Sequence, residues 1–204
     1  YQFPVVIGGV VPVVNVKGIE PGKLVLDGKT LANIYAGKIT NWSDPAIKKL
    51  NPSLTLPDLM ITVVVRADAS GTTAVFTDYL SQVSGSFKQN VGANKQINWP
   101  ADNVTAGKGN AGVAAMVQQV QGTIGYVEYA YVKTTKMNWV QVQNREGLWV
   151  SPDDEAFKAS ASNAKCDQTF YQILTDQPGK TSWPITGATF IIMPLKHHKP
   201  AEAQ

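Results

Sequence analysis

Residues 66–72 hold the side chains of this chain that are best suited to bind an anion. They read Arg-Ala-Asp-Ala-Ser-Gly-Thr. The segment follows the β-branched run 61–65, which is typical of a buried strand, and precedes a stretch, 75–80, whose apolar residues have helical spacing. The pattern predicts a strand, a short turn and the start of a helix.

A helix start of this composition offers hydrogen-bond donors to a negatively charged group. The first N–H groups of a helix have no partner within it, and the positive end of the helix dipole adds to their attraction for anions. Arg66 adds a planar fork that fits a tetrahedral oxyanion, and Gly71 has no side chain to block close approach. Ser70 and Thr72 can add donors, and Asp68 is placed to orient Arg66. We therefore predict an oxyanion site made by Arg66, Ser70, Gly71 and Thr72, with Asp68 as the orienting residue.

The same residues also have a purely structural interpretation. A Ser-Gly-Thr sequence before an apolar helix is commonly a helix cap, and Arg-x-Asp is commonly a surface ion pair. Spacing alone leaves both interpretations open.

Other chemistry finds little support in the sequence. The histidines, His197 and His198, lie in a polar terminal run, and no Gly-x-Ser-x-Gly motif of a serine hydrolase occurs. Residues 107–110, Gly-Lys-Gly-Asn, lack the spacing of a nucleotide-binding loop, and Cys166 is a single cysteine with no partner for an intrachain disulfide. We therefore predict a protein that is not an enzyme, with no catalytic residue, no cofactor and no metal site.

Composition narrows the classes of protein further. The 204 residues are 44% hydrophobic and 16% charged, which is typical of a globular protein with a substantial core. The net charge of +3 is too small and too scattered to indicate nucleic-acid binding. No apolar run is long enough for a membrane span, so direct membrane insertion is not expected.

Strands alternate with helices along the chain, which favours an α/β layer fold. Several details follow from local signals. Thr30 and Asn110 are expected to cap helices, the second running over 113–120, and residues 97–99 to form a short strand. Residues 3–16 are expected to be an extended segment covered on both faces, and 189–193 a central strand.

Residues 66–72 closely resemble the Arg-Ala-Asp-Gly-Ser-Gly-Thr signature of the periplasmic phosphate-binding proteins that serve phosphate-specific (Pst) ABC importers. Ala69 stands where glycine is common, and we expect this to have little effect. Further matches to the family occur at residues 3–4, 7–10, 26–31, 41–42, 107–110, 124–131 and 183–186.

The resemblance implies a type II-like periplasmic binding protein lobe, with a mixed sheet flanked by helices. Residues 1–16 would cross between two lobes, 17–187 would form the second lobe, and 188–204 would be the return crossing and a truncated tail. The chain starts without methionine, so we expect a processed or truncated chain. The resemblance implies that most of the first lobe is missing from it. The family's acidic acceptor for phosphate belongs to the missing segment. This chain alone is therefore expected to offer only donors and to distinguish phosphate poorly from sulfate.

The resemblance also implies a function, which is to bind inorganic phosphate as the solute-binding component of a phosphate ABC transporter. Its partners would be phosphate and the membrane permease subunits of the importer, and it would be a monomer in the periplasm. An alternative is a phosphate-binding relative that acts as an adhesin, an inhibitor or a weak phosphomonoesterase.

Overall fold

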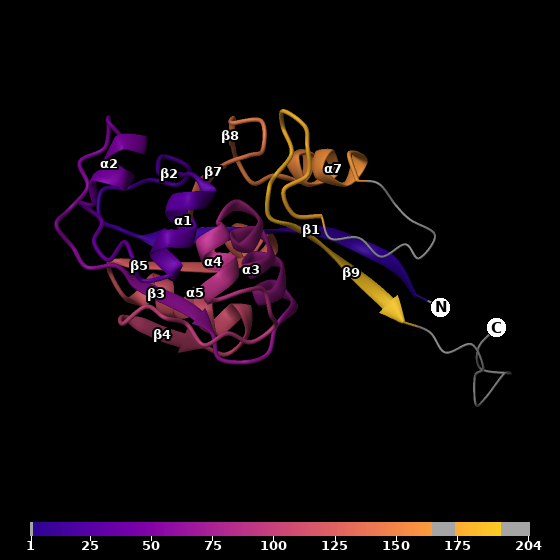
Figure 1. Cartoon of the computed structure of the whole chain (residues 1–204), viewed down its shortest axis with the longest axis horizontal. Helices are drawn as coiled ribbons and strands as arrows, with labels where there is room; N and C mark the ends of the chain where they lie inside the picture. Colours follow the sequence, from indigo (N-terminus) through magenta and orange to yellow (C-terminus); the bar gives the residue numbers. More distant parts are fainter. Residues whose placement is uncertain (1, 165–173, 193–204) are drawn as a thin grey trace, which may run out of the picture.

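A computed structural model describes residues 2–164 and 174–192 of the chain (Figure 1). The strands are β1 (Gln2–Asn15), β2 (Val25–Leu26), β3 (Thr62–Arg66), β4 (Val104–Gly107), β5 (Thr123–Glu128), β6 (Asn138–Trp139), β7 (Gln141–Gln143), β8 (Trp149–Val150) and β9 (Thr186–Ile192). The helices are α1 (Gly28–Tyr35), α2 (Pro45–Leu50), α3 (Gly71–Val83), α4 (Gly85–Asn90), α5 (Gly109–Gln119), α6 (Tyr129–Thr135) and α7 (Asp154–Ser162). Cys166, His197 and His198 lie outside the described residues.

The main sheet is built around β1, which is long enough to pair with different strands along its two halves. Residues 10–15 pair antiparallel with β5, and residues 2–9 pair antiparallel with β9. Beyond β5 lie β3 and then β4, and these three strands are parallel to one another. The predicted α/β fold with a mixed sheet is therefore confirmed.

Helices cover the sheet, and a smaller sheet lies beside it. α5 packs against β3, β4 and β5, α3 packs against α1 and β5, and α7 packs along β1 and β9 (Figure 1). The smaller sheet has the strand order β2-β7-β8. Over residues 2–164 and 174–192, every helix is too short or too polar to cross a membrane.

An aromatic cluster joins α1, α3 and β5 in the core. The rings of Phe76 and Tyr126 stack with their centroids 4.3 Å apart, and Tyr35 meets Phe76 edge-on at 4.8 Å. All three side chains are fully buried, and Trp99 packs against Tyr35 at 5.4 Å. Offset and edge-on aromatic pairs of this kind stabilise a core beyond their burial alone.

Two predicted helix caps are wrong. α1 begins at Gly28, because the carboxylate of Asp27 accepts the Thr30 N–H at 2.7 Å and so caps the helix three residues before the predicted cap at Thr30. α5 begins at Gly109, with Lys108 at the N-cap position and no side-chain cap bond. The Asn110 side chain instead accepts the backbone N–H of Glu128 at 3.2 Å, so it ties α5 to the end of β5.

The predicted strand 97–99 is also wrong. These residues form no strand, and Trp99 belongs to the aromatic cluster. The strand that pairs with β3 is β4, whose small and polar residues Val-Thr-Ala-Gly give a weak strand signal in the sequence.

The predictions for the two ends of the main sheet are partly wrong. β9 is not central, since among the described strands it pairs only with β1. Residues 10–14 are buried as expected, but the first half of β1 is not covered on both faces, because Val6 is 60% exposed. An apolar run predicts a buried strand, but it does not show which of its residues are packed against other elements. The domain boundaries 1–16, 17–187 and 188–204 stay predictions.

Candidate functional site

The candidate site lies where three neighbouring parallel strands end. β4, β3 and β5 end at Gly107, Arg66 and Glu128, and parallel pairing brings these carboxyl ends to the same edge of the sheet. Ligands of open α/β sheets commonly bind in this position. The turn at residues 67–70 then leads directly into α3.

Arg66 is held in one orientation by Asp68. Its Nε and one terminal nitrogen donate to the two carboxylate oxygens of Asp68, at 2.9 and 2.5 Å. Asp68 also accepts the backbone N–H of Gly109 at 2.9 Å, so the start of α5 fixes the carboxylate in turn. The Arg66 side chain is only 10% exposed. The edge of the guanidinium that does not face Asp68 makes one long hydrogen bond, of 3.5 Å from Nη1 to the Thr72 hydroxyl. Its other N–H groups have no acceptor among the described residues and can donate to an anion.

Ser70 is the N-cap of α3, and Gly71 and Thr72 begin its first turn. Their hydrogen-bond donors are used differently than expected. The Ser70 hydroxyl accepts the N–H groups of Thr72 and Thr73 at 3.1 and 3.4 Å, and the Ser70 N–H donates to the Lys95 carbonyl at 2.8 Å. The N–H groups of Ser70 and Thr72 are therefore engaged within the chain. The Ser70 hydroxyl proton is left to donate, because a hydroxyl can accept and donate at once.

Gly71 is the open position of this turn. A Cβ built on it would meet nothing within 4 Å, and its φ lies outside the left-handed region. Among the described residues its N–H has no hydrogen-bond acceptor. The 13-residue helix α3 thus presents an uncovered N–H at its positive end.

Three residues of the site were missed by sequence reasoning. Glu128 accepts the Thr72 hydroxyl at 3.2 Å, and Gly109 donates to Asp68. The buried hydroxyl of Tyr126 lies 2.8 Å from the Thr73 hydroxyl and 3.4 Å from the Arg66 N–H. The end of the apolar run 123–127 could have pointed to Glu128, because parallel strands place their terminal residues together.

Electrostatics at the site follow from these bonds. Hydrogen bonds from the Arg66 guanidinium and, to a smaller extent, from the Gly109 N–H hold the pKa of Asp68 well below its usual range. The hydrogen bond to Asp68 also raises the pKa of Arg66. Burial raises the pKa of the Tyr126 hydroxyl, which therefore stays neutral. Both members of the Arg66–Asp68 pair remain charged at neutral pH.

We predict that Asp68→Asn makes the protein less sensitive to acid. A carboxyl group with a lowered pKa in the folded state stabilises that state above the ordinary pKa of about 4, and the stabilisation is lost as the pH falls. The free energy of unfolding should therefore fall less for Asp68→Asn than for the wild type between neutral pH and about pH 3. Urea denaturation at a series of pH values measures this. Asp102→Asn is the control, because Asp102 lies on an exposed loop, and its free energy of unfolding should change with pH as in the wild type. Equal acid sensitivity in all three proteins would contradict the prediction.

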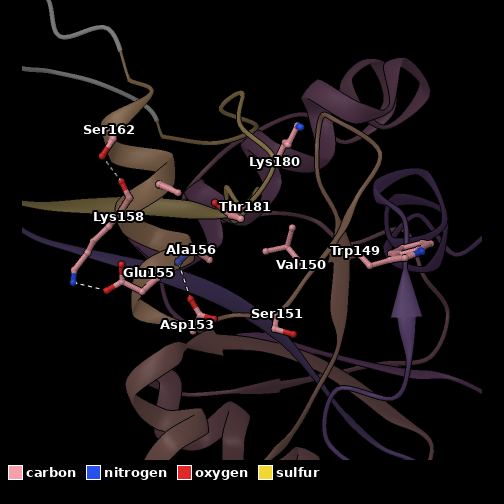
Figure 2. Close-up of a pocket in the computed structure, with 11 residues that line it drawn as sticks. Trp149, Val150, Ser151, Asp153, Glu155, Ala156, Lys158, Ser162, Lys180 and Thr181 are labelled. Atoms are coloured by element: carbon pink, nitrogen blue, oxygen red, sulfur yellow. Dashed lines mark hydrogen bonds and ion pairs between the residues drawn. The ribbon is translucent and has the colours of Figure 1, made fainter.

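A hollow of about 670 Å³ lies between α7 and β8, away from these residues (Figure 2). Three of its charged side chains already have structural partners. Lys158 pairs with Glu155 at 2.7 Å, and Asp153 caps α7 by accepting the Ala156 N–H at 2.7 Å. The convergent donors of the chain are at Arg66 and α3, so we take that region as the candidate site.

Comparison with protein families and curated proteins gives consistent results. A family model described as a PBP superfamily domain matches residues 1–204. The chain is 51% identical over 195 residues to the phosphate-binding protein PstS of Xylella fastidiosa, covering 95% of this chain and 53% of that protein. It is 50% identical over 194 residues to PstS of Haemophilus influenzae, covering 94% of this chain and 58% of that protein. The chain thus spans about half the length of these curated relatives.

Solved structures share the fold. A phosphate-binding protein from Stenotrophomonas maltophilia aligns with a TM-score of 0.66 and 22% identity, over 93% of this chain and 54% of that one. An ancestral soluble variant of the human phosphate-binding protein aligns with a TM-score of 0.69 and 19% identity, over 93% of this chain and 57% of that one. At these identities the likeness supports the fold alone.

Proposed function

The chain belongs to the PBP superfamily, and from this membership together with its site we propose that it binds inorganic phosphate as part of the solute-binding component of a phosphate ABC importer. The curated relatives that are about half identical to it are named phosphate-binding protein PstS. The single observation that carries the proposal is the fixed guanidinium of Arg66, which reaches the Thr72 hydroxyl at the start of α3, the helix whose first N–H, that of Gly71, is open.

In this proposal each predicted residue has a defined part. Arg66 supplies the positive charge and donates from the edge that does not face Asp68. Gly71 donates its backbone N–H, Ser70 donates its hydroxyl proton, and Thr72 offers its hydroxyl. Asp68 orients Arg66 and does not itself touch the anion.

Location and partners follow from the transporter function. We propose that the protein acts in the periplasm as a monomer and delivers phosphate to the membrane permease subunits of the importer. A solved structure with the same fold is that of a high-affinity periplasmic phosphate-binding protein. Binding without turnover is expected, so a colourimetric phosphatase assay with and without divalent metal should give no product.

We predict that Gly71→Ala weakens phosphate binding without lowering stability. The added methyl group meets nothing within the protein but occupies the approach to the N–H, so affinity should fall about tenfold. Gly85→Ala is a matched control, because Gly85 also follows a serine N-cap, begins α4 and would carry a Cβ with nothing within 4 Å of it. Calorimetric titration with phosphate measures the affinities, and an unchanged affinity in Gly71→Ala would argue against this site.

A further inference from the structure

The hydroxyl of Tyr126 lies between the two segments that carry the proposed anion donors, the end of β3 and the start of α3. Its oxygen accepts the Arg66 N–H at 3.4 Å and lies 2.8 Å from the Thr73 Oγ1. Tyr126 is fully buried and Thr73 nearly so, which means that bulk water cannot easily replace this hydrogen bond. A single hydroxyl group of β5 thus contacts both segments.

The strand pairing explains why a side chain makes the contact with β3. β3 and β5 pair in parallel only as far as Val64 and Gly125. The N–H of Ala67 donates to the end of β4, so the N–H of Arg66 points the other way, toward β5. There it meets the Tyr126 hydroxyl, beyond the last paired residues of the two strands. The hydroxyl therefore continues the link between β3 and β5 at the place where the site begins.

The start of α3 is tied to the same hydroxyl through Thr73. The Thr73 side chain bonds to Tyr126, and the Thr73 N–H donates to the Ser70 Oγ at 3.4 Å. Ser70 is the N-cap of α3, and its hydroxyl proton is one of the donors in the proposed site. The Tyr126 hydroxyl is thus one hydrogen bond from Arg66 and two from Ser70.

The ring that carries this hydroxyl is held by its neighbours in the aromatic cluster. It stacks on Phe76 with the ring planes only 14° apart, and its centroid lies 5.9 Å from that of Tyr35 and 6.2 Å from that of Trp99. A ring packed among three others has little freedom to move, so its hydroxyl has a fixed position. Tyr126→Phe would keep this packing and remove the hydroxyl alone.

We propose that Tyr126 is a positioning residue of the anion site, whose hydroxyl holds the end of β3 and the start of α3 in register so that Arg66 and Ser70 donate to the same anion. Tyr126 does not itself touch the anion, because its side chain is fully buried. Donors that converge on one anion lose affinity when the elements that carry them shift relative to each other.

This inference rests on the proposed phosphate site, and its test separates the two. The protein, purified at its full natural length, is titrated calorimetrically with inorganic phosphate at a temperature where thermal denaturation shows each variant to be fully folded. Tyr126→Phe and Thr73→Val each remove one partner of the same hydrogen bond, and each should weaken phosphate binding about fivefold. The double variant should be no weaker than either single variant, because the bond is lost only once. Thr73→Ser keeps the hydroxyl and should keep the wild-type affinity.

Tyr35→Phe is the matched control for a loss of core stability. Tyr35 is fully buried in the same cluster, and its hydroxyl donates to the Ile124 carbonyl at 3.5 Å, away from the site. This variant should bind phosphate as the wild type does.

Each other result is decisive. If Tyr126→Phe and Thr73→Val bound phosphate as tightly as the wild type, the role of Tyr126 would be overturned and the proposed function would stand. The role would also be overturned if Tyr35→Phe lost as much affinity as Tyr126→Phe, or if the losses of the two single variants multiplied in the double variant. A wild type that does not bind phosphate would overturn the proposed function as well.

Discussion

Arg66→Lys is expected to weaken phosphate binding by about 100-fold while the free energy of unfolding changes little. The substitution keeps the positive charge but removes the fork. Arg66 donates to both oxygens of Asp68 and still presents a second edge toward the Thr72 hydroxyl. A lysine ammonium is a single point of charge, so it can pair with Asp68 or face the anion, but it cannot do both with the geometry of the guanidinium.

The chain provides a matched control for this prediction in Arg145, its other arginine. Arg145 is exposed and lies on the turn between β7 and β8, so Arg145→Lys changes the same chemistry outside the site. Calorimetric titration of both variants with phosphate, together with urea denaturation, separates binding from stability. If Arg66→Lys bound phosphate within about threefold of the wild type, the guanidinium would not be the anion partner that the geometry indicates.

The part of the site predicted from the sequence is the part that is local in the chain. Residues 62–72 run through β3, the turn and the start of α3, and their hydrogen bonds span at most a few residues. Propensity, capping and the fixed reach of an arginine side chain are enough to place such neighbours. The structure accordingly brings Arg66, Asp68, Ser70 and Thr72 together.

The part that was missed depends on strand pairing. Gly109 is 41 residues from Asp68, and Glu128 is 56 residues from Thr72. These contacts exist only because β4 and β5 both pair parallel with β3. β4 gave almost no signal, because its Val-Thr-Ala-Gly sequence has little apolar pattern. Without β4, residues 107–110 were interpreted only as the approach to a helix.

The largest loss of stability is expected for Gly107→Ala, at the end of β4. A Cβ on Gly107 would lie 2.4 Å from the carbonyl carbon of Gly112 and 2.5 Å from the nitrogen of Val113. Both are backbone atoms in α5, so no side chain can rotate to make room, and the helix itself must move away from the strand. We expect a loss of about 3 kcal/mol or more, which corresponds to a fall in Tm of about 6 to 12 °C for a domain of this size.

Gly8→Ala is the matched control, because Gly8 is also a strand glycine and a Cβ there would meet nothing within 4 Å. Urea and thermal denaturation of the two variants measure the difference, and a Gly107→Ala protein as stable as Gly8→Ala would contradict the close packing of β4 and α5.

Phosphate binding by folded Gly107→Ala protein tests a further consequence of the same contact. Moving α5 withdraws the Gly109 N–H from Asp68, and Asp68 then holds Arg66 with one fewer constraint. A variant that loses affinity even at temperatures where it is fully folded would therefore show that α5 sets the position of Arg66 through Asp68. A fully folded variant with wild-type affinity would show that the two hydrogen bonds between Arg66 and Asp68 suffice by themselves.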